Sequence, residues 1–250
     1  MPLHIVPAAR QIAGQFNGGA IRELRPVIAN EGADVRPYSS LFYWAHAWSE
    51  QGSTIGEHPH QGFEIMSFVL DGQIDHYDSH YRAWKPLPAG SAQIIRSGSG
   101  ISHSERLHAG ARMFQIWLDP DLSRTFGQPA SYDDYAAADF PSESPQPGVQ
   151  IKHWAGPGAP MRLDTPGIRI QSLLLEAESP LEAAPGEMVS AFVVRGRLQA
   201  GGTALAEGDF FRWSGQEPLL LSPEGHAEVF LIRSPEDPGY LTYAARRRWA

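Results

Sequence analysis

Four side chains in the first half of the chain have the types and the spacing of a metal site. His58 and His60 stand two residues apart, and His103 and Glu105 repeat this spacing after a loop rich in glycine and serine. In an extended strand, residues two apart project to the same face, so each pair offers two ligands on one side. If the two segments are neighbours in a closed barrel, three imidazoles and one carboxylate converge, and this set suits a first-row divalent metal ion.

A simpler interpretation exists for each pair taken alone. A chain with ten histidines can contain a His-x-His pair by chance, and His58 and His60 would then be exposed or hydrogen-bonded loop residues. Glu105 would be a solvated surface carboxylate, because glutamate is rarely buried without a partner. Chance explains either pair more easily than both pairs together.

The composition excludes several classes of site and partner. With no cysteine among 250 residues, any metal must be held by nitrogen and oxygen, and no disulfide or thiol nucleophile exists. The formal net charge of -8 repels phosphate backbones, so we expect no direct nucleic-acid binding, and the Arg246-Arg247-Arg248 run is interpreted as a solvated end. No apolar run approaches the roughly 18 residues that cross a bilayer, and the N-terminus lacks the pattern of a secretory signal. We therefore expect a cytoplasmic protein without membrane contact.

Short strands and turns, rather than helices, must position these side chains. The Asp71-Gly72 pair between two apolar runs indicates a tight hairpin. Several short strands separated by glycine and proline are typical of a β-sandwich or barrel. The sequence predicts strands at residues 41–48, 63–70, 92–96, 112–118, 168–176, 189–194, 210–213, 219–221 and 227–233.

Residues 119–158 interrupt this pattern with many proline, serine and acidic residues. They predict a linker that contains one short helix near residues 132–138. We therefore expect two domains, an N-terminal barrel with the metal site over residues 1–140 and a C-terminal barrel over residues 141–250.

The two halves share a sequence pattern. Residues 68–74 match residues 192–198, and Pro88-Ala89-Gly90 before a strand resembles residues 206–209. A tandem of two related barrels explains the repeat, while chance likeness between hairpins is the alternative. When the halves are overlaid, the residues opposite the four candidate ligands are Glu182, Ala184, Leu221 and Pro223. The C-terminal barrel is therefore expected to have no metal ligands.

Three runs together resemble the pirin family of the cupin superfamily. They are His58-Pro59-His60-Gln61-Gly62-Phe63-Glu64, the loop that ends in His103-Ser104-Glu105, and Gln115-Ile116-Trp117-Leu118. The resemblance covers about residues 18–235, with its specific motif in the N-terminal half. It implies an all-β fold of two tandem antiparallel cupin barrels, jelly-roll-like, with a Pro/Ser-rich linker. It also implies a metal, usually iron, bound by His58, His60, His103 and Glu105.

Glu64 is an alternative carboxylate ligand, because it has the same strand parity as His58 and His60. Many cupins take their carboxylate from this first motif, whereas the resemblance to pirins points to Glu105. The run that follows Glu64 is also typical of a buried strand. We therefore favour Glu105 and give Glu64 a supporting or alternative role.

The resemblance implies a flavonol dioxygenase of the quercetin 2,3-dioxygenase type. Such an enzyme opens the central ring of quercetin with O2 and releases carbon monoxide. Three imidazoles and a carboxylate leave one or two coordination positions for the substrate and dioxygen. Fe(II) is the expected cofactor, with nickel, copper, manganese or zinc as competitors for the same ligands. Glu105 is both a ligand and the candidate base for the substrate hydroxyl.

Two other functions are open at this point. Other pirins act as iron-dependent regulatory proteins that bind a transcription regulator or a metabolic enzyme, and the acidic net charge of this chain suits a protein partner. A redox-silent cupin such as a sugar isomerase is the third interpretation. We expect the protein to be a monomer.

The remaining histidines and the tryptophans are expected to be structural. His76 and His80 should face solvent or line the barrel rim. The others have no partner at ligand spacing: His46, His108, His153 and His226. Trp44, Trp48 and Trp117 should pack in the core rather than contact substrate, because they lie in strand patterns.

Overall fold

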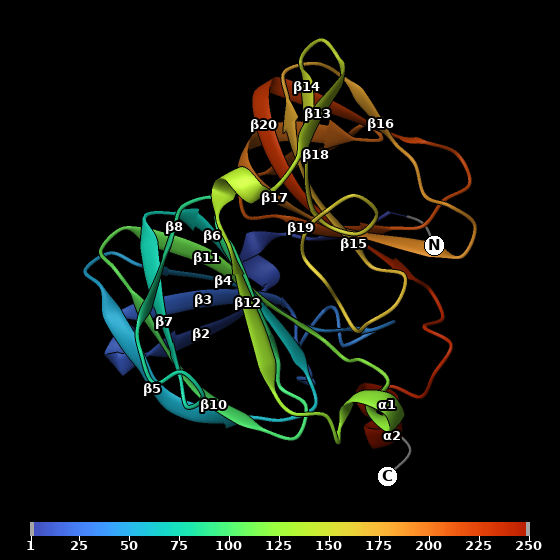
Figure 1. The fold of residues 1–250 in the computed structure, drawn as a ribbon. Helices are drawn as coiled ribbons and strands as arrows, with labels where there is room; N and C mark the ends of the chain where they lie inside the picture. Colours follow the sequence, from blue (N-terminus) through green and yellow to red (C-terminus); the bar gives the residue numbers. More distant parts are fainter. Residues whose placement is uncertain (1–2, 249–250) are drawn as a thin grey trace. The chain divides into compact units, whose positions relative to one another are not determined.

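The computed structural model describes residues 3–248, most of which form antiparallel β-strands (Figure 1). The chain divides into two compact units. We call them the N-terminal unit and the C-terminal unit, after the half of the sequence that supplies most of each.

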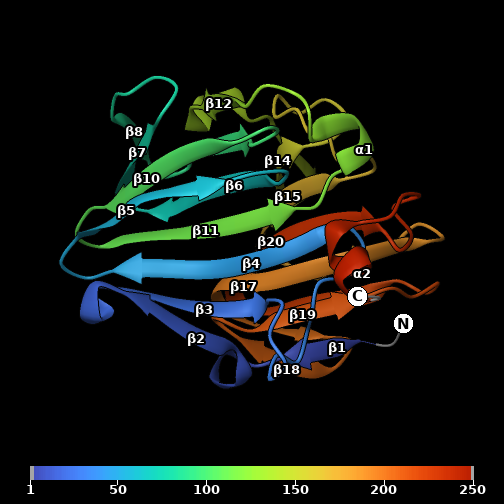
Figure 2. The same cartoon turned by 90° about the horizontal axis from the view of Figure 1, so that it is seen from below.

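The N-terminal unit contains Ile12–Asp139, Leu163–Pro166 and the C-terminal residues from Gly239. Its seven-stranded sheet has the order β12-β9-β6-β11-β4-β3-β2, with strands Ser131–Tyr135, Ala92–Arg96, Glu64–Asp71, Ala111–Leu118, Leu41–Ser49, Ile21–Val27 and Ile12–Phe16. Its four-stranded sheet has the order β5-β10-β7-β8, with strands Ser53–His60, Ile101–Leu107, Gln73–Asp78 and Lys85–Pro88. Figure 2 shows the two sheets side by side.

Alternate residues on these strands form an apolar core inside the N-terminal unit. The buried members of this core are Ile21, Ala47, Val69, Ile74, Leu87, Leu107, Ala111 and Met113. Full burial of a valine, leucine, isoleucine or methionine side chain stabilises the fold by about 1.5–3 kcal/mol, compared with leaving that side chain exposed. Two residues away from Leu107 and Met113, on the same strand faces, stand Glu105 and Gln115. The strands that bury the core therefore also present polar side chains to the interior.

The C-terminal unit contains Phe140–Arg162, Gly167–Pro238 and the N-terminal residues up to Gln11. Its antiparallel sheet has the order β1-β19-β17-β20-β15-β14-β13, with β16 paired to β20 and β18 paired to β17. In that order the strands are His4–Val6, Phe210–Trp213, Glu187–Ala200, Leu219–Pro235, Arg169–Leu175, Val149–Ala155, Ser142–Gln146, Ser179–Leu181 and Thr203–Ala206. The predicted all-β fold with antiparallel sheets in both halves is confirmed.

Each end of the chain packs in the unit formed by the other half of the sequence. Strand β1 pairs with β19, and the amide of Ala8 donates a hydrogen bond to Asp209 at 3.0 Å. At the other end, helix α2 (Tyr243–Arg248) lies in the N-terminal unit, where the amide of Ala244 donates to Asp119 at 3.0 Å. A division of the chain at a single point therefore describes the main bodies of the units but not their terminal segments.

The segment predicted to be a linker is largely folded, and its predicted helix is wrong. Ser131–Tyr135 is strand β12, which pairs with β9, and only the short 3-10 turn Ala137–Asp139 follows. Tyr132 packs on an apolar cluster that includes Ile65 and Ile95. Alternate side chains can reach this cluster from a strand, and pairing with β9 also satisfies the backbone.

The Pro- and Ser-rich run also belongs to a sheet. Ser142–Gln146 forms β13, which pairs with β14 at the edge of the sheet of the C-terminal unit. Proline is tolerated there because an edge strand leaves part of its backbone unpaired. Neither α1 (Leu122–Thr125) nor any other described helix has the length and apolar character needed to cross a membrane.

The repeated sequence pattern has a structural cause at its glycines. Gly72 joins β6 to β7 and has a φ of +66°. The predicted hairpin at Asp71-Gly72 is wrong, because β6 and β7 belong to different sheets and the turn carries the chain from one sheet to the other. Gly196 stands at the matching place in β17 with a φ of +77°, and a Cβ there would lie 2.1 Å from the carbonyl oxygen of His226. Both positions therefore need the conformational freedom and the small size of glycine.

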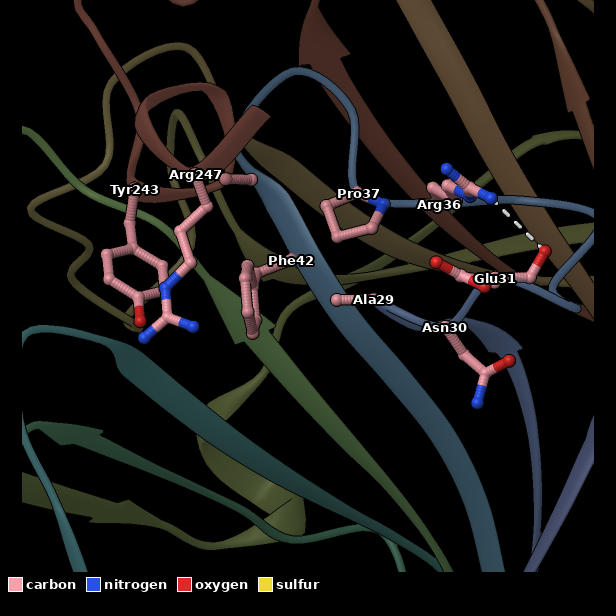
Figure 3. Close-up of a pocket in the computed structure, with 9 residues that line it drawn as sticks. Ala29, Asn30, Glu31, Arg36, Pro37, Phe42, Tyr243 and Arg247 are labelled. Carbon is pink, nitrogen blue, oxygen red and sulfur yellow. Dashed lines mark hydrogen bonds between the residues drawn. The ribbon is translucent and has the colours of Figure 1, made fainter. Parts of the chain in front are cut away.

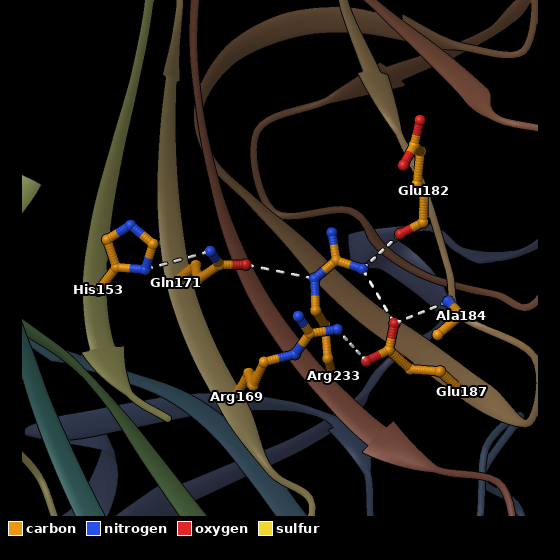
Figure 4. A network of polar contacts seen from close by, with 7 residues as sticks. All are labelled: His153, Arg169, Gln171, Glu182, Ala184, Glu187 and Arg233. Carbon is orange, nitrogen blue, oxygen red and sulfur yellow. Dashed lines mark hydrogen bonds and ion pairs between the residues drawn. The ribbon is translucent and has the colours of Figure 1, made fainter. Parts of the chain in front are cut away.

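In the C-terminal unit, a charged network includes both residues that overlay on His58 and His60 (Figure 4). Arg233 donates to the carbonyl of Glu182, and the amide of Ala184 donates to the Glu187 carboxylate at 3.1 Å. Glu187 also pairs with Arg233 at 3.2 Å. The backbone groups of Glu182 and Ala184 therefore support the ion pair between Arg233 and Glu187. Among the described residues of this unit, no group of histidines and carboxylates gathers as a metal site.

His46 makes the stability of the protein depend on pH. The side chain is buried on β4 against Trp48 and Phe114, and burial, with Arg112 as a smaller cause, lowers its pKa to about 3. The unfolded chain gains a proton here below its ordinary pKa of 6.5, whereas the folded chain does not until about pH 3. The free energy of unfolding therefore falls with acidification across this window, by up to about 1.4 kcal/mol per pH unit for one group.

We expect His46→Gln to reduce this pH slope in the metal-free protein. The measurement is urea denaturation of both proteins at several pH values between about 7 and 5, where the slope equals the difference in bound protons. Equal slopes for the two proteins would assign the proton uptake to other groups.

Candidate metal centre

The pairing of β5 with β10 brings three of the four predicted ligands together. His58 and His60 project from the same face of β5, and the antiparallel register sets His103 of β10 opposite His58. The ring centroids of His58 and His103 lie 4.5 Å apart, and each of these rings lies 4.8 Å from that of His60. The candidate ligand nitrogens lie within 4.8 Å of one another, and they form the one such group of three or more found in the described chain.

The free nitrogens of this cluster fit a metal ion. Nε2 of His60 is buried without a hydrogen-bond partner. Nδ1 of His58 bonds to the carbonyl of Gly56 at 2.8 Å, and this contact directs the Nε2 lone pair of His58 to the cluster. Nε2 of His58 lies 3.1 Å from Nε2 of His103. Two nitrogens bound at about 2.1 Å to one ion lie roughly 3.0–3.4 Å apart, so the spacing suits a shared ion.

Burial keeps the imidazoles of His60 and His103 neutral. Desolvation lowers the pKa of His60 to about 3, with His103 and His58 as smaller causes. Desolvation also lowers the pKa of His103 well below 6.5, with His58 and His76 as smaller causes. A neutral imidazole keeps the lone pair that a metal requires, so these two side chains are in their metal-binding form at neutral pH.

Glu105 lies on the wall of a cavity beside His58 and His60. Side chains of the seven-stranded sheet hold its carboxylate in place. It is 1% exposed, and its carboxylate accepts hydrogen bonds from Ser67 Oγ at 3.0 Å and from Gln115 Nε2. The register between β10 and β5 shifts between His103 and Glu105, which changes the local direction of the strand. The carboxylate is not among the ligand atoms that gather within 4.8 Å. The solvated position considered for Glu105 alone is wrong, because the group is buried and bonded.

Glu64 is occupied elsewhere. Its two oxygens accept hydrogen bonds from the amides of Asp164 and Thr165, at 2.7 and 2.9 Å, and from the hydroxyl of Thr165. Burial raises the pKa of Glu64, and these hydrogen bonds oppose the shift. Glu64 therefore fixes Leu163–Pro166 to the N-terminal unit. Its two oxygens are used by these hydrogen bonds rather than by a metal ion.

His76 is buried, so its predicted solvent-facing position is wrong. It is 1% exposed, its ring centroid lies 5.4 Å from that of His103, and its Nε2 lies 3.4 Å from Oδ2 of Asp78. The strand parity with the buried residue Ile74 is the signal that could have located it. His80 is exposed, as predicted.

Trp117 contacts the site, although it was expected in the core. Trp44 is fully buried as predicted, but Trp117 is only half-buried, lines the cavity and has its ring 4.9 Å from that of His60. It also packs on Tyr43 at 4.9 Å, and its Nε1 donates to Oε1 of Gln115 at 3.2 Å. Trp117 thus connects the histidines to the residue that holds Glu105.

The cavity beside the histidines has a volume of about 420 Å³. Its apolar wall consists of Phe16, Ala47, Ile55, Leu107, Met113 and Trp117. Its polar wall, apart from the metal cluster, consists of Glu23, Arg25, Tyr43, Glu105 and Gln115. A mostly apolar cavity with a few placed polar groups is typical of a small-molecule site.

A second cavity of about 320 Å³ lies between the loop at residues 29–37, Phe42 and helix α2 (Figure 3). The guanidinium of Arg247 lies 5.1 Å from the ring centre of Tyr243. The arginine run expected as a solvated end lies in helix α2, where Arg247 covers an aromatic ring. Phe42 and Tyr243 give this cavity an apolar wall, and its arginines are exposed at the surface.

The sequence matches known proteins over the part that forms the site. A pirin family model matches residues 28–118, which contain the three histidines and Glu105. The chain is 40% identical over 79 residues to quercetin 2,3-dioxygenase from Escherichia coli, across 29% of this chain and 32% of that protein. It is 32% identical over 103 residues to a pirin-like protein from Caulobacter vibrioides, across 40% of this chain and 37% of that protein. These alignments span well under half the length of the curated relatives.

Solved structures share the fold over nearly the whole chain. The bacterial pirin YhhW from Escherichia coli in complex with nickel(II) superposes with a TM-score of 0.75 and 23% identity, covering 93% of this chain and 99% of that chain. Quercetin 2,3-dioxygenase from Acinetobacter baumannii superposes with a TM-score of 0.79 and 17% identity, covering 93% and 79%. Residues 28–118 are therefore similar in sequence to the pirin family, and the chain shares its fold with these solved structures.

Proposed function

We propose that this chain is a metal-dependent dioxygenase that cleaves quercetin or a related flavonol with O2. The observation that carries the proposal is a cavity of about 420 Å³ whose wall includes His58 and His60. This volume lies in the range of sites that enclose small aromatic ligands. Relatives that carry the name quercetin 2,3-dioxygenase support the substrate class.

We assign the metal to His58, His60, His103 and Glu105. A bound Fe(II) ion would supply a Lewis acid for the flavonol 3-hydroxyl and a redox centre for dioxygen. Nickel, copper, manganese and zinc compete for the same nitrogen and oxygen donors. The nickel(II) in the Escherichia coli pirin of the same fold supports nickel as one of these competitors.

Glu105 is the candidate base for the proton of the 3-hydroxyl. Ser67 and Gln115 each donate to one of its oxygens, so the carboxylate is held in one orientation on the cavity wall. Each oxygen retains a lone pair that can accept a proton from a bound hydroxyl. The apolar side chains of the cavity, such as Leu107 and Met113, displace water and hold the flavonol ring.

The test is aerobic incubation of iron-loaded protein with quercetin. We expect loss of the flavonol absorption band together with oxygen uptake and release of carbon monoxide. Absence of all three with the metal bound would contradict the dioxygenase and favour the alternative, an iron-dependent regulatory protein that binds a transcription regulator or a metabolic enzyme. A cytoplasmic location and a monomeric state remain predictions from the sequence.

A further inference from the structure

A carboxylate on the cavity wall has no part in the chemistry assigned above. Glu23 of β3 is 6% exposed, and one of its oxygens accepts a hydrogen bond from the hydroxyl of Tyr43 at 3.1 Å. The other oxygen lies 3.3 Å from Nη1 of Arg25. All three side chains line the cavity that also contains His58 and His60. Glu23 is therefore a buried acid that faces the same space as the metal cluster.

The surroundings of Glu23 hold it in place. Arg25 is itself fixed, because its guanidinium donates to the backbone carbonyls of Ile12 and Ala13 at 3.3 and 2.6 Å. Gly14 stands opposite Glu23 in the β2–β3 pairing, and a Cβ at Gly14 would lie 2.3 Å from Oε1 of Glu23. Gly14 thus leaves room for the carboxylate of Glu23. The hydroxyl of Tyr43 and the guanidinium of Arg25 then hold this carboxylate in one position.

The burial of Glu23 has a cost that its partners offset only in part. Desolvation raises the pKa of Glu23, whereas Arg25 and Tyr43 oppose the rise and the charge of Glu105 adds to it. Two partners leave further lone pairs on the carboxylate free to accept hydrogen bonds. A buried acceptor directed into a cavity is the kind of group that recognises a ligand with matching donors.

We propose that Glu23, positioned by Tyr43 and Arg25, binds the phenolic hydroxyl groups at the end of the substrate that lies away from the metal. The substrate class is a flavonol with adjacent hydroxyls on its pendant ring, and this part of the inference rests on the proposed function. A carboxylate can accept both hydrogens of such a pair, while Leu107 and Met113 contact the ring faces. Glu23 therefore selects between hydroxylated and bare pendant rings.

The test compares two flavonols under anaerobic conditions, where binding is measured without turnover. Quercetin carries two adjacent hydroxyls on its pendant ring, and 3,5,7-trihydroxyflavone carries none there. For Glu23→Gln we expect about tenfold to hundredfold weaker binding of quercetin in a fluorescence titration, because hydrogen bonds to a charged acceptor are lost. Binding of 3,5,7-trihydroxyflavone and the bound metal content should stay unchanged.

Two further variants separate recognition from folding. Tyr43→Phe keeps the ring but removes the hydroxyl, so the preference for quercetin should fall by less than in Glu23→Gln. Glu50→Gln removes an exposed carboxylate of the same unit and should leave both affinities unchanged. A Glu23→Gln protein that weakens both flavonols equally, or neither, would overturn the inference, because selectivity would not depend on this carboxylate.

The failure of this inference and that of the dioxygenase have different signatures. Wild-type protein that binds quercetin selectively but does not consume oxygen would contradict the dioxygenase and leave the role of Glu23 intact. Wild-type protein that turns quercetin over with no loss of selectivity in Glu23→Gln would contradict only the role of Glu23. Wild-type protein that binds neither flavonol would overturn both.

Discussion

Replacing His60 by alanine is expected to weaken metal binding by at least about a hundredfold and to abolish flavonol cleavage. Nε2 of His60 is buried and has no hydrogen-bond partner in the described chain. Removal of this atom therefore breaks no hydrogen bond within the protein. Loss of a residue that only supports a ligand already costs about tenfold to hundredfold in affinity, and loss of a ligand should cost more. Metal content after dialysis, measured by elemental analysis, gives the result directly.

The matched control is His226→Ala. His226 is an exposed histidine of the C-terminal unit, so its removal changes the composition in the same way but leaves the cluster intact. It should bind one equivalent of metal, the stoichiometry that we also expect for the wild-type protein. His60→Ala is also expected to fold, because the side chain is only half-buried. Equal metal content in both variants would place the ion elsewhere in the protein.

Glu64→Gln is expected to reduce stability and leave metal affinity nearly unchanged, whereas Glu105→Gln is expected to reduce metal affinity and leave stability nearly unchanged. Glu64 accepts three hydrogen bonds from Asp164 and Thr165, so the neutral amide loses acceptors for donors that remain buried. A buried hydrogen bond to a charged group contributes about 1.5–3 kcal/mol, and we expect Glu64→Gln to lose at least this much stability. Its metal affinity should change little, because none of these contacts involves the histidine cluster.

Glu105→Gln should instead reduce metal affinity and flavonol turnover while it retains most of the stability. The amide keeps an acceptor for Gln115 or Ser67 and fills the same volume, but it loses the charge and the capacity to take up a proton. Urea denaturation and metal titration of the two variants separate the roles. Full turnover of metal-loaded Glu105→Gln would contradict its role as base, and unchanged stability of Glu64→Gln would contradict its structural role.

The sequence predicted the parts of this protein that depend on local pattern. Strand alternation placed β4, β9 and β11 within one residue of their observed bounds. The His-x-His spacing predicted that His58 and His60 share a face, and the structure adds the β5–β10 register that sets His103 opposite His58. These features follow from the two-residue period of a strand, which is visible in the sequence itself.

The parts that failed depend on contacts between distant segments. Tyr132 lies in a polar stretch that suggests a linker, yet this stretch forms strand β12, which pairs with the edge of β9. Trp117 has the parity of a core residue but reaches the open cavity, because the site and the core occupy the same interior faces. Glu64 has the parity of a ligand, and only the position of Thr165, about a hundred residues away along the chain, shows what it binds.

The exchange of terminal segments was also beyond sequence pattern. Strand β1 is three residues long, and helix α2 is six residues long, so neither carries a strong periodic signal. Their places are set by partners from the other half of the sequence, such as Asp209 for Ala8 and Asp119 for Ala244.

Anomalous diffraction from crystals of metal-loaded protein, recorded at the absorption edge of the bound metal, locates the ion itself. We expect one strong peak within bonding distance of His58, His60 and His103, with Glu105 beside it. A peak at any other group of side chains, or a metal-loaded protein with no peak among these three rings, would contradict this expectation.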